Sequence, residues 1–349
     1  MSKLKAAVIG AGWFAAHSHI PVLATRDEVE LDGVCRLGAA DLARVKDHFG
    51  FAFASEDYRE VLARKPDIVV VSSPHALHYE QARAALEGGA HVMCEKPMTL
   101  DPGQAWDLVR IAEEHDRHLL IANSHNYLPH VADLHDRIAD GLIGEIEHVA
   151  CSFISVTREV FTGADGLKRW DAAFFRPDRS TWQDPAGGGG FAYGQLSHSL
   201  ALMYYLSGLD PEKVSALTRQ AEGVDIADAA VLGCAGGATV SISGSVAMPQ
   251  GERALMRVFL AGSLGLITAE FDLDRCEIKL NDGTREMLPL KPGDWAVNSA
   301  GPVDALADLA LGRGRNQSSG SIGALTTATI HAMLRSAAED GVMMPVQAQ

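Results

Sequence analysis

The sequence lacks the features of membrane-spanning, secreted and nucleic-acid-binding proteins. No apolar run among its 349 residues approaches the roughly 20 residues of a membrane helix. Met1 to Lys5 lead into an apolar run without a secretory signal segment. Basic residues are scarce, since 30 Lys and Arg stand against 45 Asp and Glu, a formal charge of −15. This acidity disfavours nucleic acid and anionic membranes as partners, and we expect a cytoplasmic protein.

The sequence also gives little indication of disulfide bonds or of a metal site. The five cysteines are odd in number, far apart and mostly set in apolar runs, without a C-x-x-C pair, so we expect reduced core residues. The histidines lack the spacing and the neighbouring ligands of a zinc site, and we expect no structural or catalytic metal. These residues are Cys35, Cys94, Cys151, Cys234 and Cys276, and His17, His19, His75, His78, His125, His130 and His135.

The first third of the chain alternates short apolar runs with helical patterns. This is the rhythm of βαβ units around a parallel sheet. We therefore expect residues 1–123 to form a Rossmann domain with a doubly wound parallel sheet. The expected strands are Leu4–Ile9, Val29–Cys35, Ile68–Val71, His91–Cys94 and His118–Ala122, and the expected helices are Asp41–His48, Asp57–Ala63, Ala76–Leu86 and Pro102–His115.

The rest of the chain has β-rich runs joined by Gly or Asp-Gly turns, which favour a largely antiparallel sheet. We expect residues 124–349 to form a C-terminal α/β domain with a large, mostly antiparallel open sheet that binds substrate and mediates oligomerisation. The long loop Asp165–Gly190 is a candidate active-site wall. The expected strands are Ile146–Val156, Val214–Leu217, Ala229–Leu232, Ala238–Val246, Leu255–Leu260 and Glu277–Leu280, and the expected helices are Gln195–Leu206, Val303–Leu311 and Ile322–Ala338.

A lysine directly after an apolar strand is the clearest indication of chemistry. The run Met93-Cys94-Glu95-Lys96-Pro97 places it where an open parallel sheet has its ligand crevice. Near the N-terminus, Gly10-Ala11-Gly12-Trp13-Phe14-Ala15 follows another strand as G-x-G-x-x-A. One glycine allows a tight turn, the next lets the backbone approach a pyrophosphate, and the small third residue permits close packing. The phosphates would then lie at a helix N-terminus.

Shorter motifs recur in a fixed order along nearly the whole chain. They are Ser73-Pro74-His75 with His78, Asn126-Tyr127 with Pro129, Gly141-Leu142-Ile143-Gly144, and Gly187–Gly190 before His198. Together with the glycine fingerprint and the Glu-Lys-Pro tripeptide, they resemble the glucose-fructose oxidoreductase and inositol dehydrogenase (Gfo/Idh/MocA) family. The resemblance implies an NAD(P)-dependent oxidoreductase.

By this resemblance, Lys96 contacts the reacting hydroxyl or carbonyl beside the nicotinamide, and Pro97 follows a cis bond that aims it. Oxidising an alcohol requires removal of its O–H proton, which a lysine with a pKa lowered by burial can accept. The alternative is a surface pair of Lys96 with Glu95. The resemblance places in the cofactor site Gly10, Gly12, Trp13, Phe14, Arg36, Ser73, Pro74, His75, His78, Glu95 and Lys96.

The chain departs from the family after its glycine run. Many members carry the equivalent of G-G-G-x-x-x-D-x-G-x-H-x-x-D, but here the expected carboxylates fall at Gly194 and Ala201. His198 is then the acid/base partner of the lysine, and a buried core histidine is the alternative. Gln195 lies at i, i+3 from His198 and so on the same helix face. Whether Gly194 opens room for a bulkier substrate, or for a water that replaces the carboxylate, stays open.

Further side chains are candidates for substrate contacts. By resemblance, Asn126 and Tyr127 border the substrate hydroxyls, and a capping Asn with a half-buried Tyr is the alternative. In the long loop, Trp170, Arg176 and Trp182 could stack on a sugar ring or hold an acid group. Anchoring tryptophans and a solvated arginine are the alternative. The resemblance implies a sugar, inositol, sugar acid or related glycoside as substrate.

The residue that ends the second strand bears on cofactor choice. NAD sites usually place a carboxylate there, whereas NADP sites often place an arginine nearby for the added phosphate. Here Arg36 stands at that point, and the next acid, Asp41, lies inside the expected helix. The sequence therefore favours NADP, although an arginine can also stack on adenine.

We expect an NAD(P)-dependent dehydrogenase or reductase that transfers a hydride between the nicotinamide and a secondary alcohol or ketone, acting as a homodimer or homotetramer. Two alternatives stay open. Redox-neutral glycoside cleavage on the same fold predicts release of an aglycone without accumulation of reduced cofactor. A non-catalytic nucleotide- or sugar-sensing protein predicts saturable nucleotide binding without turnover.

Overall fold

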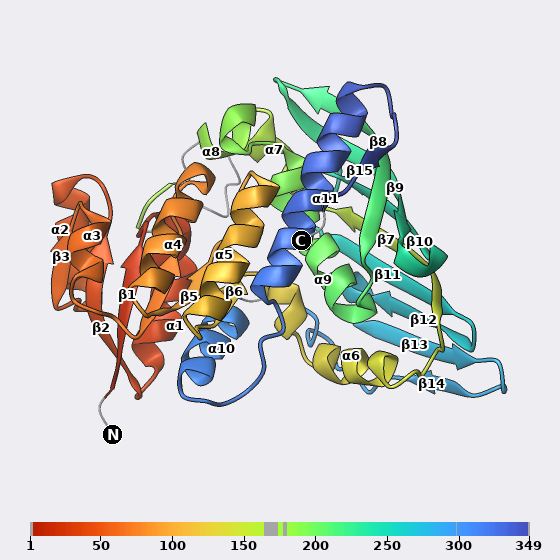
Figure 1. Ribbon diagram of the computed structural model, residues 1–349, viewed down its shortest axis with the longest axis horizontal. Helices are drawn as coiled ribbons and strands as arrows, with labels where there is room; N and C mark the ends of the chain where they lie inside the picture. Colours follow the sequence, from red (N-terminus) through yellow and green to blue (C-terminus); the bar gives the residue numbers. More distant parts are fainter. Residues whose placement is uncertain (1–2, 164–173, 177–179, 298, 348–349) are drawn as a thin grey trace. The chain divides into compact units, whose positions relative to one another are not determined.

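The computed structural model describes residues 3–163, 174–176, 180–297 and 299–347, which form two compact units (Figure 1). The first unit consists of the described residues within Met1–Ser124, Lys168–Thr181 and Asn298–Ala324. The second consists of those within His125–Leu167, Trp182–Val297 and Leu325–Gln349. Among the described residues, no helix combines the length and apolar character needed to cross a membrane.

The first unit is built on a six-stranded parallel sheet with the order β3-β2-β1-β4-β5-β6, as expected for a doubly wound fold. The strand order reverses between β1 and β4, and the carboxyl ends of these strands mark the ligand crevice. The short β3 was missed in the sequence because its three residues are only partly buried. The strands are β1 (Leu4–Ile9), β2 (Val29–Cys35), β3 (Phe53–Ser55), β4 (Ile68–Val71), β5 (His91–Cys94) and β6 (Leu119–Ile121).

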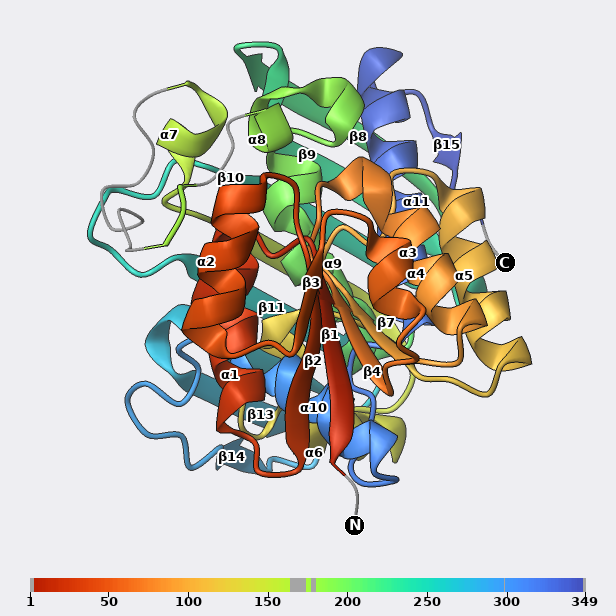
Figure 2. The same ribbon diagram turned by 90° about the vertical axis from the view of Figure 1, so that its left-hand side faces the viewer.

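Helices cover both faces of this sheet (Figure 2). One core packs α3, α4 and α5 against alternate strand residues such as Ile9 and Val71, and the other packs α1, α2 and α10 against Val8 and Val70. Each fully buried valine or isoleucine contributes about 1.5–3 kcal/mol. The helices are η1 (Ala15–His19, a π-helix), α1 (Ile20–Thr25), α2 (Ala39–Phe49), α3 (Tyr58–Leu62), η2 (His75–Leu77, a 3₁₀ turn), α4 (His78–Glu87), α5 (Pro102–Glu114) and α10 (Ala300–Ala310).

The second unit is built on a nine-stranded sheet with the order β14-β13-β12-β11-β7-β10-β9-β8-β15. Only the β7–β10 pair is parallel within the described residues, so the expectation of a mostly antiparallel sheet is confirmed. The strands are β7 (Ile146–Ile154), β8 (Pro211–Ala221), β9 (Val224–Cys234), β10 (Thr239–Ser245), β11 (Leu255–Gly262), β12 (Gly265–Glu270), β13 (Arg275–Leu280), β14 (Arg285–Met287) and β15 (Met344–Pro345).

Helix α9 packs on strands β7 and β11 of this sheet and is buried over most of its length. The helix expected over Gln195–Leu206 is in fact a π-helix, η6, followed by α9. The Tyr204 hydroxyl bonds Thr329 of α11 at 2.5 Å. The remaining helices are η3 (Ser124–Tyr127), α6 (Val131–Ala139), α7 (Arg158–Phe161), α8 (Ser180–Gln183), η5 (Pro185–Gly187), η6 (Ala192–Leu196), α9 (Ser197–Ser207), η7 (Ala235–Gly237), η8 (Phe271–Leu273) and α11 (Gly320–Ala338).

Candidate active site

The glycine-rich turn after β1 has the geometry of a phosphate cradle. Gly10 has a φ of +83°, and a Cβ there would overlap the backbone of Ser73. A Cβ on Gly12 would meet only the Gly10 carbonyl oxygen within 4 Å, at 3.9 Å, so the backbone at Gly12 stays open to a ligand. The third small residue, Ala15, is fully buried at the start of η1. This turn therefore fits a dinucleotide pyrophosphate at the helix N-terminus.

Lys96 lies two residues after the end of β5, with Glu95 between, and the Lys96–Pro97 peptide bond is cis, as the resemblance implies. Burial lowers the pKa of Lys96, and the negative charge of Glu95 acts in the opposite direction. The net pKa is below the ordinary lysine value, so the neutral amine is more populated at neutral pH than in a solvated lysine. Glu95 is buried and Lys96 partly buried, which does not match a solvated surface pair.

Glu95 is held by a histidine from the first helical turn. His19 Nε2 lies 2.7 Å from Glu95 Oε1, while Glu95 Oε2 accepts a bond from the Lys96 backbone N–H at 3.0 Å. Burial raises the pKa of Glu95, but the bond and charge of His19 and the charge of Lys96 outweigh it and leave the pKa below its ordinary value. The carboxylate is therefore ionised.

His78 braces the turns that follow β4 and β5. Its Nδ1 lies 2.9 Å from the Pro97 carbonyl oxygen and its Nε2 lies 2.8 Å from the Ser73 carbonyl oxygen. Burial lowers the pKa of His78 against the opposing effect of these carbonyls. The Ser73 hydroxyl bonds Gln81 at 2.5 Å. Pro74 precedes η2, and His75 is buried within it, so these residues shape the crevice edge.

Arg36 is engaged by several groups at the end of β2. Its Nη2 lies 3.0 Å from Asp41 Oδ2, its Nη1 bonds the Ala11 carbonyl oxygen at 3.2 Å, and its guanidinium lies 3.8 Å from the centre of the Phe175 ring. Arg44 also pairs with Asp41, at 3.4 Å. Two guanidinium groups thus share the Asp41 carboxylate, while a second carboxylate, Glu56, accepts a bond from the Gly38 N–H at 2.5 Å.

Aromatic rings surround a small pocket beside the glycine turn. The pocket holds about 200 Å³ and is lined by Trp13, His17, Phe49 and Phe174, among others. The Trp13 ring lies nearly parallel to His17, with ring centroids 6.3 Å apart. The Phe14 ring lies 5.6 Å from the Trp13 ring and also packs edge-on against His19 at 5.1 Å. Trp13 therefore faces the pocket, whereas Phe14 supports His19.

In the second unit, Gln195 of η6 and His198 of α9 are both partly buried. Every residue in the fully described run from Phe191 to Leu206 is buried except these two. The His198 ring centroid lies 5.4 Å from that of His125, in a T-shaped arrangement. Burial and then the charge of Arg253 lower the pKa of His125 to about 4. His125 therefore stays neutral at physiological pH and adds no charge beside His198.

Aromatic rings lie against Gly194, where many family members carry a carboxylate. A Cβ on Gly194 would lie 2.8 Å from Cζ of Phe161 and 3.4 Å from Cζ3 of Trp182. The two rings pack edge to face at 6.0 Å. The position of a Gly194 Cβ therefore offers no room for a substrate or a water, and the absence of a side chain at Gly194 makes room for the Phe161 ring. Trp182 serves as an anchor here, Arg176 is exposed, and Trp170 lies outside the described residues.

Asn126 and Tyr127 belong to η3, beside α9. The Asn126 side chain is fully buried, and its Nδ2 donates to the Ala201 carbonyl oxygen at 3.4 Å. Tyr127 is partly buried. Asn126 therefore ties η3 to the helix that carries His198.

Sequence reasoning missed a pair of buried acids, Asp225 and Asp228 on β9. The Asp225 carboxylate accepts a bond from the Ala192 N–H at 2.6 Å, and a Cβ on Gly190 would overlap it. This explains the glycine, which also has a φ of +105°. Burial and the neighbouring charge of Asp225 raise the pKa of Asp228 to about 9. A pattern of alternating buried residues in a strand gives no indication that two acids lie on its inner side.

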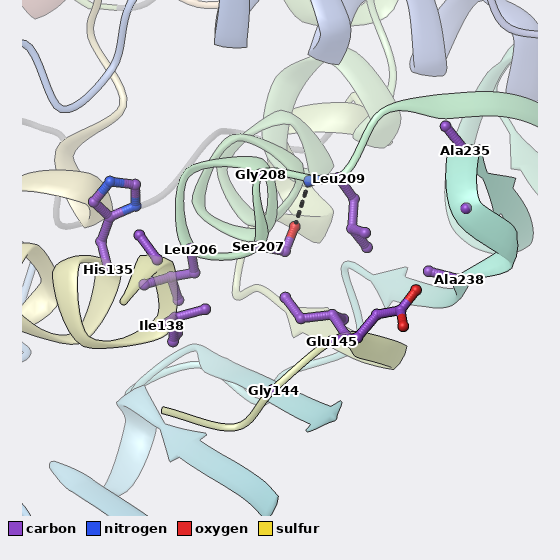
Figure 3. A pocket seen from close by; sticks show the side chains of 13 residues that line it. His135, Ile138, Gly144, Glu145, Leu206, Ser207, Gly208, Leu209, Ala235 and Ala238 are labelled. Carbon is purple, nitrogen blue, oxygen red and sulfur yellow. Dashed lines mark hydrogen bonds between the residues drawn. The ribbon is translucent and has the colours of Figure 1, made fainter. Parts of the chain in front are cut away.

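A separate pocket of about 400 Å³ lies at the other end of α9 (Figure 3). His135, Ile138, Glu145 and Leu206 are among its lining residues, and none of the predicted site residues is. In the described part of the chain, no three His, Cys, Asp or Glu side chains form a group that could hold a metal ion. The five cysteines are free and buried, as predicted.

Comparison with known proteins agrees with this fold. A family model described as "Oxidoreductase family, NAD-binding Rossmann fold" matches residues 4–123, and one described as "GFO/IDH/MocA C-terminal domain" matches residues 131–268. The D-glucoside 3-dehydrogenase of Escherichia coli (strain K12) is 36% identical over 146 residues, which cover 42% of this chain and 42% of that protein. The D-xylose 1-dehydrogenase (NADP(+)) of Haloarcula marismortui is 32% identical over 143 residues, which cover 40% of each.

These matches span less than half the length of either relative. Among solved structures, a levoglucosan dehydrogenase in complex with NADH and levoglucosan superimposes with a TM-score of 0.78 over 99% of this chain and 100% of that chain, at 18% identity. At 18% identity, this structural similarity shows a common fold and nothing more. Because the two domain models match consecutive parts of the chain and the sheet orders fit them, the protein belongs to the Gfo/Idh/MocA family of oxidoreductases.

Proposed function

We propose that the protein transfers a hydride between a nicotinamide cofactor and a secondary alcohol or ketone of a sugar, inositol, sugar acid or glycoside. The observation that carries this proposal is Lys96, a partly buried lysine with a lowered pKa at the carboxyl end of β5, in the same unit as an open glycine cradle. In this proposal, residues 1–123 bind the dinucleotide and residues 124–349 bind the substrate. The bound nicotinamide supplies the hydride acceptor or donor.

The protein's own residues handle the proton. Lys96, in its neutral form, accepts the alcohol proton at Nζ during oxidation and returns it to the oxygen during reduction. As an ammonium group it stabilises the negative charge that develops on that oxygen. His198, the accessible histidine of α9, is the proposed acid/base partner, and Gln195 on the same face donates or accepts a hydrogen bond without taking a proton.

The proposed substrate class rests on the family and on the names of the relatives, two of which are sugar or glucoside dehydrogenases. Tyr127 and Arg176 stay as proposed contacts to substrate hydroxyls or an acid group. Buried Asn126 and anchoring Trp182 are proposed to shape the site through their neighbours, because each packs inside the second unit.

For the cofactor we propose NADP over NAD. Arg36 and Arg44 share Asp41, so their net positive charge suits the added phosphate of NADP. The opposing feature is Glu56 at the Gly38 N–H, because a carboxylate near this point is what NAD sites use for the ribose hydroxyls. The dissociation constants of both nucleotides, measured side by side, decide between them.

The direct test is formation of reduced nicotinamide by the purified protein with NAD or NADP against inositols, aldoses, sugar acids and glycosides. We expect a rise with at least one member of the panel. Release of an aglycone without that rise would support redox-neutral cleavage instead, and nucleotide binding without any turnover would support a sensing role. Light scattering of the same sample tests the proposed homodimer or homotetramer.

A further inference from the structure

The second unit contains a pocket that is lined by none of the residues of the proposed reaction. It holds about 400 Å³, towards the small end of the roughly 300–1,000 Å³ that is usual for ligand pockets, so it suits a small molecule. It lies at the C-terminal end of α9, next to the end of α6 and the start of β7 (Figure 3). What it can bind follows from the groups that it presents.

Part of the lining is apolar. Ile138 of α6 and Leu206 of α9 are buried, and Leu209 beyond the end of α9 is half-buried. Alanine and glycine make up much of the remaining lining, so bulky side chains do not fill the space. These walls suit the hydrocarbon part of a ligand.

The end of α9 gives one side of the pocket a negative character. The last four carbonyl oxygens of an α-helix have no intrahelical partner and carry the negative end of the helix dipole. The Gly208 N–H bonds the first of them at 2.9 Å, and His135 Nδ1 donates to the second at 2.6 Å. Among the described residues, no N–H or O–H group bonds the carbonyl oxygens of Leu206 and Ser207. Both oxygens are therefore available to a donor.

Glu145 brings a full negative charge to the same pocket. Its side chain reaches towards Ala238 in Figure 3. Its backbone N–H bonds Ser263 Oγ at 3.1 Å, which fixes the main chain at this point. Within the described ranges, no basic side chain pairs with the Glu145 carboxylate. Glu145 is exposed, so a ligand can reach it from solvent.

The hydrogen-bond donors of the lining are largely used within the protein. The Ser207 hydroxyl donates to Met203 Sδ at 3.6 Å and accepts from the Leu209 N–H at 3.3 Å. The N–H groups of Gly144 and Ala235 each bond a backbone carbonyl oxygen. The pocket therefore offers a ligand acceptors and negative charge, together with apolar walls.

We propose that this pocket is a binding site for a small organic ammonium ion, attracted by the Glu145 carboxylate and by the negative end of the α9 dipole, with its hydrocarbon part against Ile138 and Leu206. An ammonium group carries only donors, which matches the acceptors of the pocket. An anion of the same shape meets like charge at Glu145 and at the helix end. A neutral alcohol keeps the apolar contacts and loses the attraction between charges.

The test uses cyclohexylammonium, cyclohexanol and cyclohexanecarboxylate, which share a shape and differ in charge. Each is titrated into the full-length protein with ¹³C-labelled isoleucine δ1 methyl groups, and Ile138→Val identifies the Ile138 signal by removing it. This signal should shift saturably with cyclohexylammonium, at an affinity about threefold to tenfold higher than for cyclohexanol, and should not saturate with the carboxylate. Equal affinities for the three probes, an unmoved Ile138 signal, or the same shift with potassium chloride would overturn the proposal.

Two variants assign the charge effect to this pocket. Glu145→Gln keeps the length of an exposed side chain and removes its charge, so the affinity for cyclohexylammonium should fall towards that for cyclohexanol. Glu252→Gln is the matched control, because this exposed glutamate follows β10 at its far end, whereas β10 begins directly after Ala238 in the pocket. An unchanged affinity in Glu145→Gln, or an equal loss in Glu252→Gln, would contradict the assignment. The measurement needs neither nicotinamide nor sugar, so its outcome is independent of the proposed hydride transfer.

Discussion

Glu95 and Asp228 are two carboxylic acids buried to a similar extent, at 8% and 4% exposure, yet they differ in charge. Glu95 has two bases beside it, and its pKa lies below the ordinary value despite burial. Asp228 has only another acid, Asp225, and its pKa is raised to about 9. Burial acts on both in the same direction, so the sign of the result is set by the neighbours.

The difference bears on what each region does. A buried carboxylate that stays ionised can control the proton of an adjacent lysine, which suits a reacting centre. A buried acid that stays protonated is uncharged at neutral pH, and with Asp225 it fastens the start of η6 by the bond from the Ala192 N–H. The region around Glu95 therefore keeps a buried negative charge, whereas the region around Asp228 holds the start of η6 in place.

The largest expected effect tests whether the ionised region is the reacting one. Lys96→Ala should lower turnover by about two to four orders of magnitude, the usual contribution of acid/base catalysis, while nucleotide affinity changes little. Steady-state kinetics and a nucleotide-binding titration measure the two quantities. Unimpaired turnover would remove Lys96 from the mechanism, and an equal loss of nucleotide binding would assign it to the cofactor instead.

The second effect tests the protonated region through stability. Because the folded-state pKa of Asp228 is about 9 against 3.8 for the ordinary group, the folded protein keeps a proton that the unfolded chain releases. The free energy of unfolding should therefore fall as pH rises from about 4 to about 9.

Asp228→Asn mimics the protonated acid and should remove that fall, so its gain in free energy of unfolding over the wild-type protein should be larger at pH 8 than at pH 5. Urea unfolding at pH 5 and at pH 8 provides the measurement, with wild-type protein as the reference. If Asp228→Asn changed the free energy of unfolding by the same amount at both pH values, Asp228 would be ionised in the folded state. The contrast with Glu95 would then not exist.

A third effect concerns the site where the family's usual carboxylate is absent. Gly194→Ala should destabilise the protein by about 1–3 kcal/mol, because the new Cβ would meet the ring of Phe161. Phe161→Leu should absorb most of that cost when the two changes are combined. Thermal unfolding of the single and double variants forms the cycle, and additive losses would show that the ring does not press on Gly194.

The smallest expected effect concerns Asp41, a more exposed acid that, like Glu95, lies beside two basic groups. Where Glu95 is one acid beside two bases inside the protein, Asp41 is one acid between Arg36 and Arg44 closer to the surface. Asp41→Asn should release the guanidinium groups and shift the ratio of NAD to NADP dissociation constants about tenfold or less towards NADP. Arg36→Ala should shift it the other way, and Arg59→Ala, on the exposed face of α3, should leave it unchanged.

Much of the fold could be predicted because its signals are local. Buried strands such as β4 are continuous apolar runs, and the G-x-G-x-x-A turn and Glu95-Lys96-Pro97 each have a meaning that depends on the few residues around them. The short strand β3 was invisible because it is only partly buried. The strand β12 was missed although its buried and partly buried residues alternate. The reason is that apolar runs lie close to it on both sides, so the sequence does not mark it as a separate strand.

The candidate site was predictable only where it depends on one segment. The place of Lys96 follows from the apolar run before it, whereas the shared face of Gln195 and His198 stays a prediction, because Gln195 lies in a π-turn. The contact of His19 with Glu95 joins residues 76 positions apart in the sequence, and the pattern of neither segment predicts it. The filling of Gly194 by Phe161 is equally remote, and the spacing rule for helices assumed an α-turn where the chain forms a π-turn.

Two π-turns occur in the described chain, η1 and η6, and each stands at the start of a helix with a candidate histidine at or just after its end. A π-turn holds one residue more than the α-turn it replaces. Loss of a single codon between residues 15 and 18 would regularise the first helix and turn His19 away from Glu95 without changing any other side chain. In this protein the contact between His19 and Glu95 thus depends on one extra residue in the turn, and a one-residue deletion there is expected to break it.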